Sequence, residues 1–495
     1  MSRLMLSVSG CRGVIGRTLT PEVAARFAGC FGAFLVERSA GRPVTVVLGR
    51  DGRRGSEVIA AAACAGLAGA GCRVIDLGVA ATPTVAVETD VFARARPPAA
   101  GMVVTASHNP QDWCGLKCLL ADGGEFGSAA CAPPADLARL IIDRFERAQP
   151  GTASWDAIGT IEPLAGAHDE HVERLAEALE AAGLAEDPST LGEGLKVALD
   201  SVNASGAEAA RAFLEAVGCE EILHLGAEGD GIFRHPPEPT SENLGLPGGL
   251  CDAVRESASD VGFAQDPDAD RLAIIDERGR YIGEEYTLAL GALALLEARR
   301  RRAEPTQGCV LVTNLSTSRM LDDVAARFGA RVERTPVGEA HVVETMKRLA
   351  AAGTPVLAGG EGNGGLIWPR VTYVRDSLSS MAMILALLRD GPDRRRVSDL
   401  VASIPAYAIE KRKVDLPRRE DAAPGLERVA NAFRAQRLDT RDGVWVDFTH
   451  GPLAGRAWLH VRASNTEPIL RLIAEAPTPA AARSILDEAG RVLNQ

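Results

Sequence analysis

Three aspartates alternate along one short segment, at Asp266, Asp268 and Asp270, and Arg271 follows directly. Because alternate residues of an extended loop face the same side, we expect the three carboxylates to converge. Carboxylates held close together repel one another, and a divalent cation relieves that repulsion. Ligand sets made only of oxygen atoms are typical of Mg²⁺, Mn²⁺ or Ca²⁺. The segment therefore predicts a metal site, and a solvated acidic turn is the alternative.

A calcium loop of the EF-hand type is a second way to interpret the same segment. Glu277 stands at the twelfth position counted from Asp266, where such a loop carries its bidentate glutamate. Arg271, however, stands at the sixth position, where the loop requires glycine. The apolar run Leu272–Ile275 that follows is typical of a strand. An EF-hand is therefore disfavoured.

A serine follows another apolar run, Val103–Ala106, which predicts a strand. Ligand sites of open α/β sheets lie at the carboxyl ends of strands, so we expect Ser107 on an exposed turn that a ligand can reach. A turn that merely ends the strand is the alternative. A Ser-His-Asp triad is disfavoured, because the adjacent Ser107 and His108 are expected to point in different directions and no Gly-x-Ser-x-Gly elbow is present.

Glycines are dense between Gly360 and Gly365, where the chain matches the pattern G-x-G-x-x-G. Pro369 follows within a few residues, so no helix N-terminus is available to hold a pyrophosphate, and a dinucleotide site is disfavoured. Glu361 and Asn363 would instead present a carboxylate and an amide to the hydroxyls of a sugar. A tight turn without a ligand is the alternative.

A polar turn near the C-terminus contains side chains of the types that bind anions: Arg462, Ser464, Asn465 and Thr466. A guanidinium, two hydroxyls, an amide and the N–H groups of a turn form a compact nest for a phosphate. The turn therefore predicts a phosphate-binding site, and a bare hairpin turn is the alternative.

The segments that must position these motifs repeat the order strand–helix–strand. Short apolar runs separated by helix-forming segments are typical of parallel sheets in α/β layers. The order occurs three times, at Val44–Leu48, Ser56–Ala70 and Val74–Leu77, at Leu195–Leu199, Ala207–Val217 and Ile222–Leu225, and at Cys309–Val312, Ser318–Phe328 and Val332–Thr335. Three related α/β domains with mixed, mostly parallel sheets are therefore expected.

The C-terminal part of the chain has a different pattern. Trp458–Val461 and Ile469–Ile473 are interpreted as strands, and a helix capped by Thr478, with Pro479 at its first position, is expected to follow. This pattern predicts a small α+β domain. Polar stretches are expected to link the domains, near 149–156, 276–283 and 391–399. The predicted domains are 1–155, 156–282, 283–398 and 399–495.

Composition limits the class of protein. The chain has 495 residues, of which 46% are hydrophobic and 24% charged, as is ordinary for a folded protein of several domains. Its net charge is −12, from 54 basic and 66 acidic residues, and only 4% of its residues are aromatic. The basic field and the stacking surface that nucleic acids need are therefore missing. An anionic substrate would require a local basic pocket.

Cysteine usage and hydropathy predict the compartment. The ten cysteines include no C-x-x-C pair, which argues against a zinc ribbon and a thioredoxin-like motif. The first residues carry no apolar run of signal-peptide length, and the apolar stretch Leu288–Leu296 is too short to span a bilayer. A reduced, soluble, cytoplasmic protein that binds neither membrane nor nucleic acid is expected.

Taken in order along the chain, the motifs resemble those of the α-D-phosphohexomutase superfamily. The resemblance rests on the serine loop (Thr-Ala-Ser-His-Asn-Pro, 105–110), the metal loop (Asp-Pro-Asp-Ala-Asp-Arg, 266–271), the sugar loop (Gly-Glu-x-x-Gly-Gly, 360–365) and the phosphate loop (Arg-x-Ser-Asn-Thr-Glu-Pro, 462–468). Shorter matches stand at Ser9–Gly13, Gly49–Arg53 and Val337–Glu339. The resemblance implies four domains around a central cleft, each contributing one loop, and the sugar loop is similar to that of the archaeal branch.

In that family the serine of the first motif carries a phosphoryl group, which the resemblance implies for Ser107. It also implies a Mg²⁺ ion held by the phosphoserine and the three aspartates of the metal loop, and it implies Lys117 as the general acid/base. Three further residues are expected to help: Arg271 offsets the remaining negative charge, Arg12 holds the phosphoryl group, and His108 is an assisting donor.

The reaction that the resemblance implies interconverts hexose 6-phosphate and hexose 1-phosphate through the phosphoserine and a bound hexose 1,6-bisphosphate. Glu361 and Asn363 would hold the sugar, and the phosphate loop would hold the phosphate that is not transferred. Phosphoglucosamine mutase is the first expectation, and phosphomannomutase or phosphoglucomutase is the second. A metal-dependent sugar phosphatase and an inactive sugar-phosphate sensor are the rivals from other classes. A monomer or a homodimer is expected.

Overall fold

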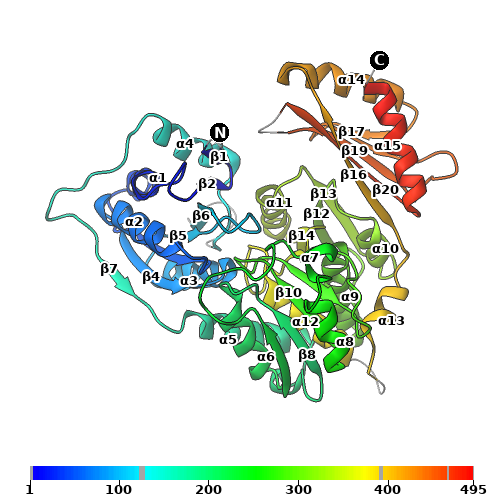
Figure 1. Ribbon diagram of the computed structural model, residues 1–495, viewed down its shortest axis with the longest axis horizontal. Coiled ribbons are helices and arrows are strands. Elements are labelled where there is room, and N and C mark those ends of the chain that lie inside the picture. The colour runs from blue at the N-terminus through cyan, green and yellow to red at the C-terminus, as the bar shows by residue number, and fades with distance from the viewer. Residues whose placement is uncertain (1–3, 122–128, 390–393, 465–467, 494–495) are drawn as a thin grey trace.

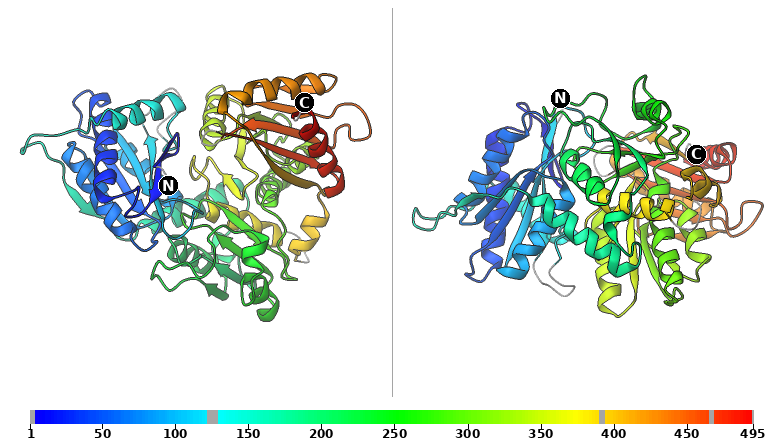
Figure 2. Two further views of the ribbon diagram at one scale, coloured as in Figure 1. Left: turned by 45° about the horizontal axis from the view of Figure 1, so that its top comes forward. Right: turned by 90° about the horizontal axis from the view of Figure 1, so that it is seen from below.

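Four β-sheets follow one another along the chain (Figure 1). The computed structural model describes residues 4–121, 129–389, 394–464 and 468–493. The first sheet and the C-terminal sheet lie at opposite ends of the molecule, and the second and third sheets lie between them (Figures 1 and 2).

Each sheet has a strand order that differs from the order along the chain. From one edge to the other, the first sheet contains β1 (Met5–Ser7), β2 (Gly10–Val14), β6 (Trp113–Ala121), β5 (Ala99–Val104), β3 (Thr45–Arg50), β4 (Arg73–Val79) and β7 (Ile161–Pro163). The second contains β11 (Leu272–Ile275), β10 (Val261–Gln265), β8 (Lys196–Asp200) and β9 (Glu221–Leu225). The third contains β13 (Arg331–Thr335), β12 (Val310–Asn314), β14 (Val356–Glu361) and β15 (Gly365–Ile367). The C-terminal sheet contains β16 (Ala408–Asp415), β20 (Ile469–Ala476), β19 (Trp458–Ala463), β18 (Val444–Asp447) and β17 (Arg437–Asp439).

The first three sheets share one four-stranded arrangement. In chain order, the first strand pairs in parallel with the second and the third, and the fourth strand runs antiparallel beside the third. This gives the orders β6-β5-β3-β4, β11-β10-β8-β9 and β15-β14-β12-β13. The prediction of three related α/β domains with mixed, mostly parallel sheets is confirmed.

This repetition places three of the four sequence motifs at equivalent positions. The serine loop joins β5 to β6, the metal loop joins β10 to β11, and the sugar loop joins β14 to β15. In each copy the chain reverses at the carboxyl end of the third parallel strand in order to form the antiparallel fourth strand. Because ligand sites of α/β sheets lie at such strand ends, three related turns supply three parts of one site.

The helices of the first three domains cover the sheets. They are α1 (Pro21–Arg38), α2 (Ser56–Gly69), α3 (Thr82–Ala95), α4 (Ala135–Glu146), α5 (Ala167–Ala182), α6 (Gly206–Ala216), α7 (Ser241–Leu244), α8 (Leu250–Ser257), α9 (Glu285–Arg301), α10 (Met320–Ala326), α11 (Glu339–Ala351), α12 (Ser377–Arg389) and α13 (Val397–Ala402), with a short 3-10 turn at Pro188–Thr190. The predicted crossover helices correspond to α2, α6 and α10. The strand β7 pairs with β4 in the first sheet although it lies beyond residue 155, the predicted end of the first domain. The predicted domain limits stay a prediction.

The C-terminal domain has an antiparallel five-stranded sheet, where the sequence indicated only β19 and β20. Its remaining elements are a 3-10 turn at Arg419–Asp421, α14 (Ala422–Ala432) and α15 (Pro479–Leu493). The predicted N-cap is confirmed, because Thr478 Oγ1 accepts a hydrogen bond of 3.2 Å from the Ala481 amide. The strand β16 was missed because four consecutive residues in its middle, 410–413, are charged, and a half-exposed strand of this kind has little apolar signal.

The apolar core is continuous between the second and third domains, where α5, α9 and α12 pack together. Separate apolar clusters fill the first and the C-terminal domains. The stretch Leu288–Leu296 lies in α9 and is buried in the shared core. None of the helices in the described residues is long and apolar enough to cross a membrane.

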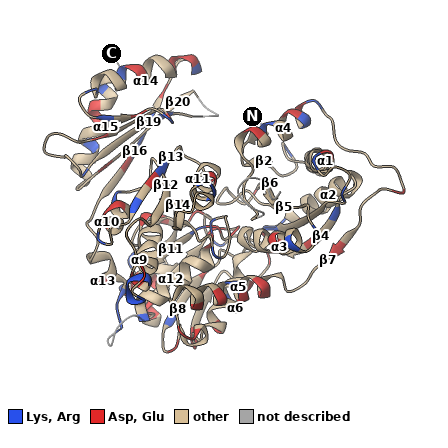
Figure 3. Ribbon diagram, turned by 180° about the vertical axis from the view of Figure 1, so that it is seen from behind, with Lys and Arg blue, Asp and Glu red and all other residues tan. Residues whose placement is uncertain are grey.

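Charged residues lie mainly on the outer helices and loops, and most strands of the first three sheets are apolar (Figure 3). A run of arginines closes α9 at Arg299, Arg300 and Arg301. The ten cysteines are all buried, and none of them forms a disulfide in the described residues.

Candidate active site

Ser107 lies at the first of the three equivalent turns, with a backbone φ of 50°, in the left-handed region. Its hydroxyl donates a hydrogen bond of 2.7 Å to Asp266 Oδ2 in the metal loop. The expectation of an exposed turn is wrong, since only 4% of Ser107 is exposed. The reason is that the metal loop of the second domain covers the serine loop of the first.

A buried ion pair supports the serine loop from below. Arg53 Nε lies 2.8 Å from Asp51 Oδ2, and both side chains are fully buried. The guanidinium also donates to the carbonyl oxygens of Ser107 and Trp113, each at 2.6 Å. Asp51 accepts a 2.7 Å hydrogen bond from Thr105 Oγ1, which in turn accepts from the Ser107 amide at 2.8 Å. Arg53 therefore holds the serine turn in place, and its presence in the Gly49–Arg53 motif has a structural reason.

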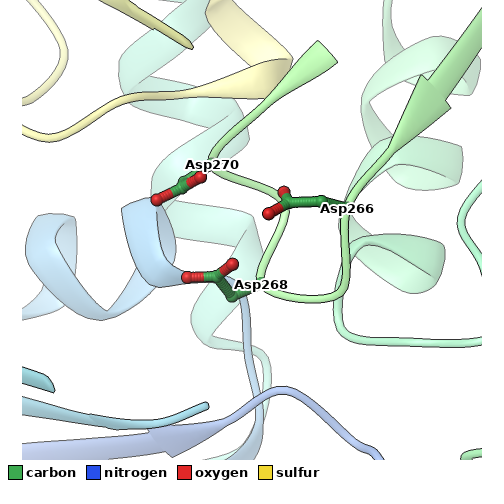
Figure 4. A group of neighbouring side chains, drawn as sticks. All are labelled: Asp266, Asp268 and Asp270. Atoms are coloured by element: carbon green, nitrogen blue, oxygen red, sulfur yellow. The ribbon is translucent and has the colours of Figure 1, made fainter. Parts of the chain in front are cut away.

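The three aspartates of the metal loop converge, as Figure 4 shows. One carboxylate oxygen from each lies within 4.8 Å of the others, and all three residues are buried. The loop is a turn rather than an extended segment: the Ala269 amide donates to the Asp266 carbonyl oxygen, and Ala269 has a φ of 52°. The predicted convergence is confirmed, but the turn produces it.

The electrostatics of Asp266 and the unpartnered oxygens of its two neighbours are compatible with a cation between the three carboxylates. Burial and the neighbouring Asp268 and Asp270 raise the pKa of Asp266 well above its usual range. Asp268 Oδ1 and Asp270 Oδ1 are buried without a hydrogen-bond partner among the described residues. An all-oxygen set with two unpartnered oxygens fits a hard divalent cation. Glu277 accepts hydrogen bonds from Ser398 and belongs to a separate turn, which removes the EF-hand alternative.

Lys117 enters the site from β6 and is nearly fully buried. Its Nζ lies 3.1 Å from Asp270 Oδ2, 3.9 Å from Asp268 Oδ2 and 4.0 Å from Glu339 Oε2. Burial disfavours the charged ammonium, but Glu339, Asp270 and Asp268 outweigh burial and raise the pKa of Lys117. A lysine that acts as a general acid/base is helped by burial and by nearby cations, which lower its pKa. Here the nearest charged neighbours of Lys117 are carboxylates, which act in the opposite direction.

Arg12 and Arg271 add positive charge near the aspartates. Burial lowers the pKa of Arg12, and the nearby Asp268 and Asp270 counter that effect. The Arg271 amide donates to Asp266 Oδ1 at 3.1 Å, and its Nε lies 3.8 Å from Asp270 Oδ1. Both arginines are thus near the place where a phosphoryl group on Ser107 would lie.

His108 Nδ1 lies 3.3 Å from Ser107 Oγ, so the expectation that the two side chains point apart is wrong. The left-handed turn at Ser107 brings them together. Burial, with Arg271 and Arg12 nearby, lowers the pKa of His108 to about 3, so its ring is neutral at physiological pH. Its nearest carboxylate is that of Glu238, 3.9 Å from Nε2 and half-exposed. The contact suits a hydrogen-bond partner for the serine rather than the base of a Ser-His-Asp triad.

The sugar loop is connected to the metal loop by an arginine that sequence reasoning missed. Arg375 Nη2 donates to Asp270 Oδ2 at 2.6 Å, and its Nη1 donates to Glu361 Oε2 at 3.2 Å. Its Nε lies 3.0 Å from Glu339 Oε2. Glu361 also accepts a 2.8 Å hydrogen bond from Asn314 Nδ2. In the sequence, Arg375 is only part of the segment Tyr-Val-Arg-Asp after the sugar loop. That segment does not indicate which residues the arginine contacts.

A cavity of about 460 Å³ lies between the third domain and the C-terminal sheet. Glu361 and Asn363 line one side of it and Arg462 lines the other, so two predicted loops face one space. Lys413 and Arg471, which sequence reasoning missed, line it beside Arg462. The strand register places Lys413 opposite Arg471, and Arg471 opposite Arg462, on three neighbouring strands. Five basic and three acidic side chains line the cavity, so its lining is basic overall, as an acidic chain needs for an anionic ligand.

The structure places the remaining predicted residues as follows. Ser464 is buried, and its amide donates to the Ile469 carbonyl oxygen at 3.0 Å at the start of the phosphate loop. Asn465 and Thr466 lie outside the described residues. Ser107, His108, Lys117, Arg12, Arg271 and the three aspartates form one group, and Arg375 joins that group to Glu361 and the cavity.

Comparison with known proteins agrees with this geometry. Models of the three α/β/α domains of the phosphoglucomutase/phosphomannomutase family match residues 3–132, 163–279 and 284–407, and the model of its C-terminal domain matches 412–491. The solved structure of a phosphoglucomutase/phosphomannomutase family protein from Burkholderia thailandensis superimposes with a TM-score of 0.77 at 25% identity, covering 99% of this chain and 98% of that one.

Two sequence relatives match over nearly the whole chain. A protein named "Probable phosphoglucosamine mutase" from Methanopyrus kandleri is 33% identical over 485 residues, which cover 97% of this chain and 95% of the relative. A "Phosphoglucomutase/phosphomannomutase" from Thermococcus kodakarensis is 33% identical over 496 residues, which cover 98% and 97%. The fold and site thus define an isomerase of the phosphohexomutase class. The chain belongs to the phosphoglucomutase/phosphomannomutase family, within the α-D-phosphohexomutase superfamily.

Proposed function

We propose that the protein interconverts glucosamine 6-phosphate and glucosamine 1-phosphate by means of a phosphoryl group carried on Ser107. In the first half-reaction a sugar hydroxyl attacks the phosphorus, the bond from phosphorus to Ser107 Oγ breaks, and a hexose 1,6-bisphosphate results. The bisphosphate then reorients, Ser107 Oγ attacks its other phosphate, and the isomeric monophosphate leaves. Each cycle restores the phosphoserine, so no outside phosphoryl donor is consumed.

The observation that supports this proposal most is the position of the serine hydroxyl. Ser107 Oγ bonds Asp266 at 2.7 Å in a buried group that also contains Lys117, while a separate basic cavity lies across the sugar loop. A hydrolase would need only the buried group around Ser107 and not the second cavity. Two anion-binding regions, with Glu361 and Asn363 between them to bind sugar hydroxyls, suit an intermediate that carries a phosphate at each end.

The metal loop fits a Mg²⁺ ion, which Asp266, Asp268 and Asp270 would hold together with an oxygen of the phosphoserine. When bound, the cation supplies Lewis-acid stabilisation of the charge that develops on the transferred phosphoryl oxygens. Arg12 and Arg271 are proposed to hold the same phosphoryl group from the protein side. Ser107, Lys117 and the three aspartates are buried, which would limit the access of water that could hydrolyse the phosphoserine.

Proton transfer is assigned to the residues next to the serine. Lys117 is proposed to exchange the proton of the reacting hydroxyl, and His108 is proposed to assist through its contact with Ser107 Oγ. Glu361 and Asn363 are proposed to accept and donate hydrogen bonds to the sugar hydroxyls, with Arg375 keeping Glu361 oriented. These groups place the sugar so that either the 1-position or the 6-position reaches Ser107.

Glucosamine phosphate is the first choice of substrate because the relative from Methanopyrus kandleri carries the name of a phosphoglucosamine mutase. Mannose and glucose phosphates are the second choice, because the relative from Thermococcus kodakarensis matches equally well under the other name. We expect turnover of glucosamine 6-phosphate at a higher kcat/KM than glucose 6-phosphate or mannose 6-phosphate, each primed with its bisphosphate and measured side by side. A higher kcat/KM with mannose or glucose 6-phosphate would replace the substrate assignment, and release of free phosphate without isomerisation would replace the mutase with a phosphatase.

Substitution of Arg462 by alanine should weaken the binding of the phosphate that is not being transferred. Loss of one charged hydrogen-bond donor to phosphate costs about 1.5–3 kcal/mol, equivalent to roughly ten- to a hundredfold in kcat/KM. Because binding energy far from the reacting atoms also orients the reacting hydroxyl, kcat should fall as well as affinity. Steady-state kinetics in both directions check this expectation.

The matched control for this variant is Arg456→Ala, which removes an exposed arginine from the same domain. Phosphorylation of Ser107 and metal binding should be unchanged in both variants, since neither arginine lies near the serine loop. If Arg462→Ala and Arg456→Ala had the same kinetics as wild type, the phosphate loop would be only a hairpin turn.

A further inference from the structure

The turn between β17 and β18 (440–443) connects the phosphate loop with the third domain. Asp442 accepts a hydrogen bond of 3.0 Å from the Val337 amide on its Oδ2 atom. Arg462 Nε lies 3.2 Å from the same Oδ2 and 3.3 Å from Oδ1. One carboxylate thus bridges an arginine of the C-terminal domain and a backbone amide of the third domain. Both charged side chains are mostly buried, with exposed fractions of 16% for Arg462 and 19% for Asp442.

The turn that carries Asp442 is fixed tightly against β19. Gly443 has a φ of 77°, and a Cβ atom at this position would lie 2.3 Å from the Val461 carbonyl oxygen and 2.9 Å from the Arg462 Cα atom. The Asp442 carbonyl oxygen lies 2.6 Å from His460 Nε2, and the other ring nitrogen lies 2.8 Å from Ser316 Oγ in the third domain. The backbone of the turn is therefore held from both domains, and the position of the carboxylate is determined.

The direction of the contact leaves the guanidinium available for a ligand. Asp442 occupies Nε, which lies on the side of the guanidinium nearest the chain. The two terminal amino groups, which form the fork that matches a phosphate, have no hydrogen-bond or ion-pair partner among the described residues, and Arg462 lines the cavity. A carboxylate that holds Nε therefore fixes the plane of the guanidinium without competing for its terminal nitrogens.

Val337 connects this contact to the other end of the site. It precedes Gly338 and Glu339, and Glu339 lies 3.0 Å from Arg375 Nε and 4.0 Å from Lys117 Nζ. The amide that Asp442 binds is thus two residues from a carboxylate that contacts both the sugar-loop arginine and the lysine beside the metal loop.

We propose that Asp442 is a positioning residue, which aligns Arg462 for the phosphate of the substrate only when the C-terminal domain is seated on the third domain. This inference rests on the proposed function for the identity of the ligand. Seating brings Val337 to the carboxylate, the carboxylate orients the arginine, and the phosphate then meets a guanidinium whose direction is already set. This would increase the affinity for the phosphate by preorganisation, because the arginine loses little conformational freedom when the ligand binds.

A double-mutant cycle with Arg462→Ala tests this role. Asp442→Ala should raise KM and lower kcat/KM by roughly three- to tenfold, because Arg462 loses its orientation. Asp442→Asn should retain part of the activity, since its amide oxygen still accepts a hydrogen bond. In the Arg462→Ala background, Asp442→Ala should have no further effect, because the residue acts through the arginine. Asp439→Asn, in the strand that leads to the same turn, is the control for a change of charge, because the Asp439 carboxylate bonds Arg441.

The alternatives give different results in the same cycle. If Asp442 only stabilised the domain, its loss would cost the same factor with and without Arg462, which would overturn the proposal. If Asp442 competed with the phosphate, Asp442→Asn would bind substrate more tightly than wild type, which would overturn it also.

A binding measurement separates this proposal from the proposed function. The dissociation constant of glucosamine 6-phosphate is measured by calorimetry in excess chelator, where no turnover is expected. Wild-type protein that binds the sugar phosphate but never isomerises it would contradict the proposed function alone. The cycle of dissociation constants would still test Asp442: non-additive effects support its positioning role, and additive effects or no binding overturn it.

Discussion

Replacement of Ser107 by alanine is expected to abolish isomerisation, with kcat reduced by about 10⁴-fold or more, the scale seen when a nucleophile is removed. The variant keeps the ion pair of Arg53 and Asp51 below the loop, and the contacts of Arg53 and Thr105 with residue 107 involve only backbone atoms. The turn should therefore fold unchanged. Only the Oγ atom, which would accept the phosphoryl group, is lost. Initial rates with a bisphosphate-primed hexose phosphate measure the effect.

The control for this variant is Ser154→Ala, which removes an exposed serine hydroxyl between the first two domains. Binding of glucosamine 6-phosphate should survive in both variants, since the sugar loop and the phosphate loop are untouched. A Ser107→Ala protein that still isomerises its substrate at a rate near wild type would contradict the role of the serine.

The second large effect is expected at the metal loop. Asp268 is suited to a clean test, because Oδ2 accepts a 2.7 Å hydrogen bond from Thr82 Oγ1 while Oδ1 is buried without a partner among the described residues. Asp268→Asn keeps the acceptor for Thr82 and removes the charge that would hold the cation. We expect kcat to fall by about 10²- to 10³-fold, equivalent to roughly 3–4 kcal/mol of transition-state stabilisation. Chelation should abolish turnover of the wild type, and Mg²⁺ should restore it.

Glu256→Gln makes the same change of charge on an exposed helix of the same domain and should leave both kcat and the Mg²⁺ requirement unchanged. Calorimetric titration with Mg²⁺ should show weaker binding by Asp268→Asn than by Glu256→Gln. Full activity of the wild type in excess chelator would show that the three carboxylates have another role.

Much of the fold was predictable because it repeats. The apolar runs that became β3, β8 and β12 each precede a crossover helix, and that local order is sufficient to indicate a parallel sheet. The equivalence of the serine, metal and sugar loops was not predictable, because it depends on how β6, β11 and β15 pair with their neighbours, which a residue pattern does not show. Of the three strands, β15 has only three residues and so has little apolar signal of its own. The strand β16 was not predicted because its middle is a run of four charged residues, 410–413.

The parts of the site that sequence reasoning missed are those that act through partners distant in the chain. Asp270 and Arg375 are 105 residues apart, and their contact depends on how the second and third domains pack. Asp442 was missed for the same reason, because its partner in the third domain, the Val337 amide, is distant in the chain. An aspartate in a hairpin turn is common and gives no signal by itself. Lys413 lies on β16 and Arg471 on β20, two segments that are far apart in the sequence. Only the sheet register places them beside Arg462 at the cavity.

The most direct test of the account is to follow the phosphoryl group itself. Protein freed of phosphate is incubated with Mg²⁺ and glucosamine 1,6-bisphosphate labelled in its phosphates, and the label is located by peptide mass spectrometry. The account predicts label on Ser107 in wild-type protein, its loss on addition of unlabelled glucosamine 6-phosphate, and its absence from Ser107→Ala. Label found only on other residues, or isomerisation without any label on Ser107, would contradict it.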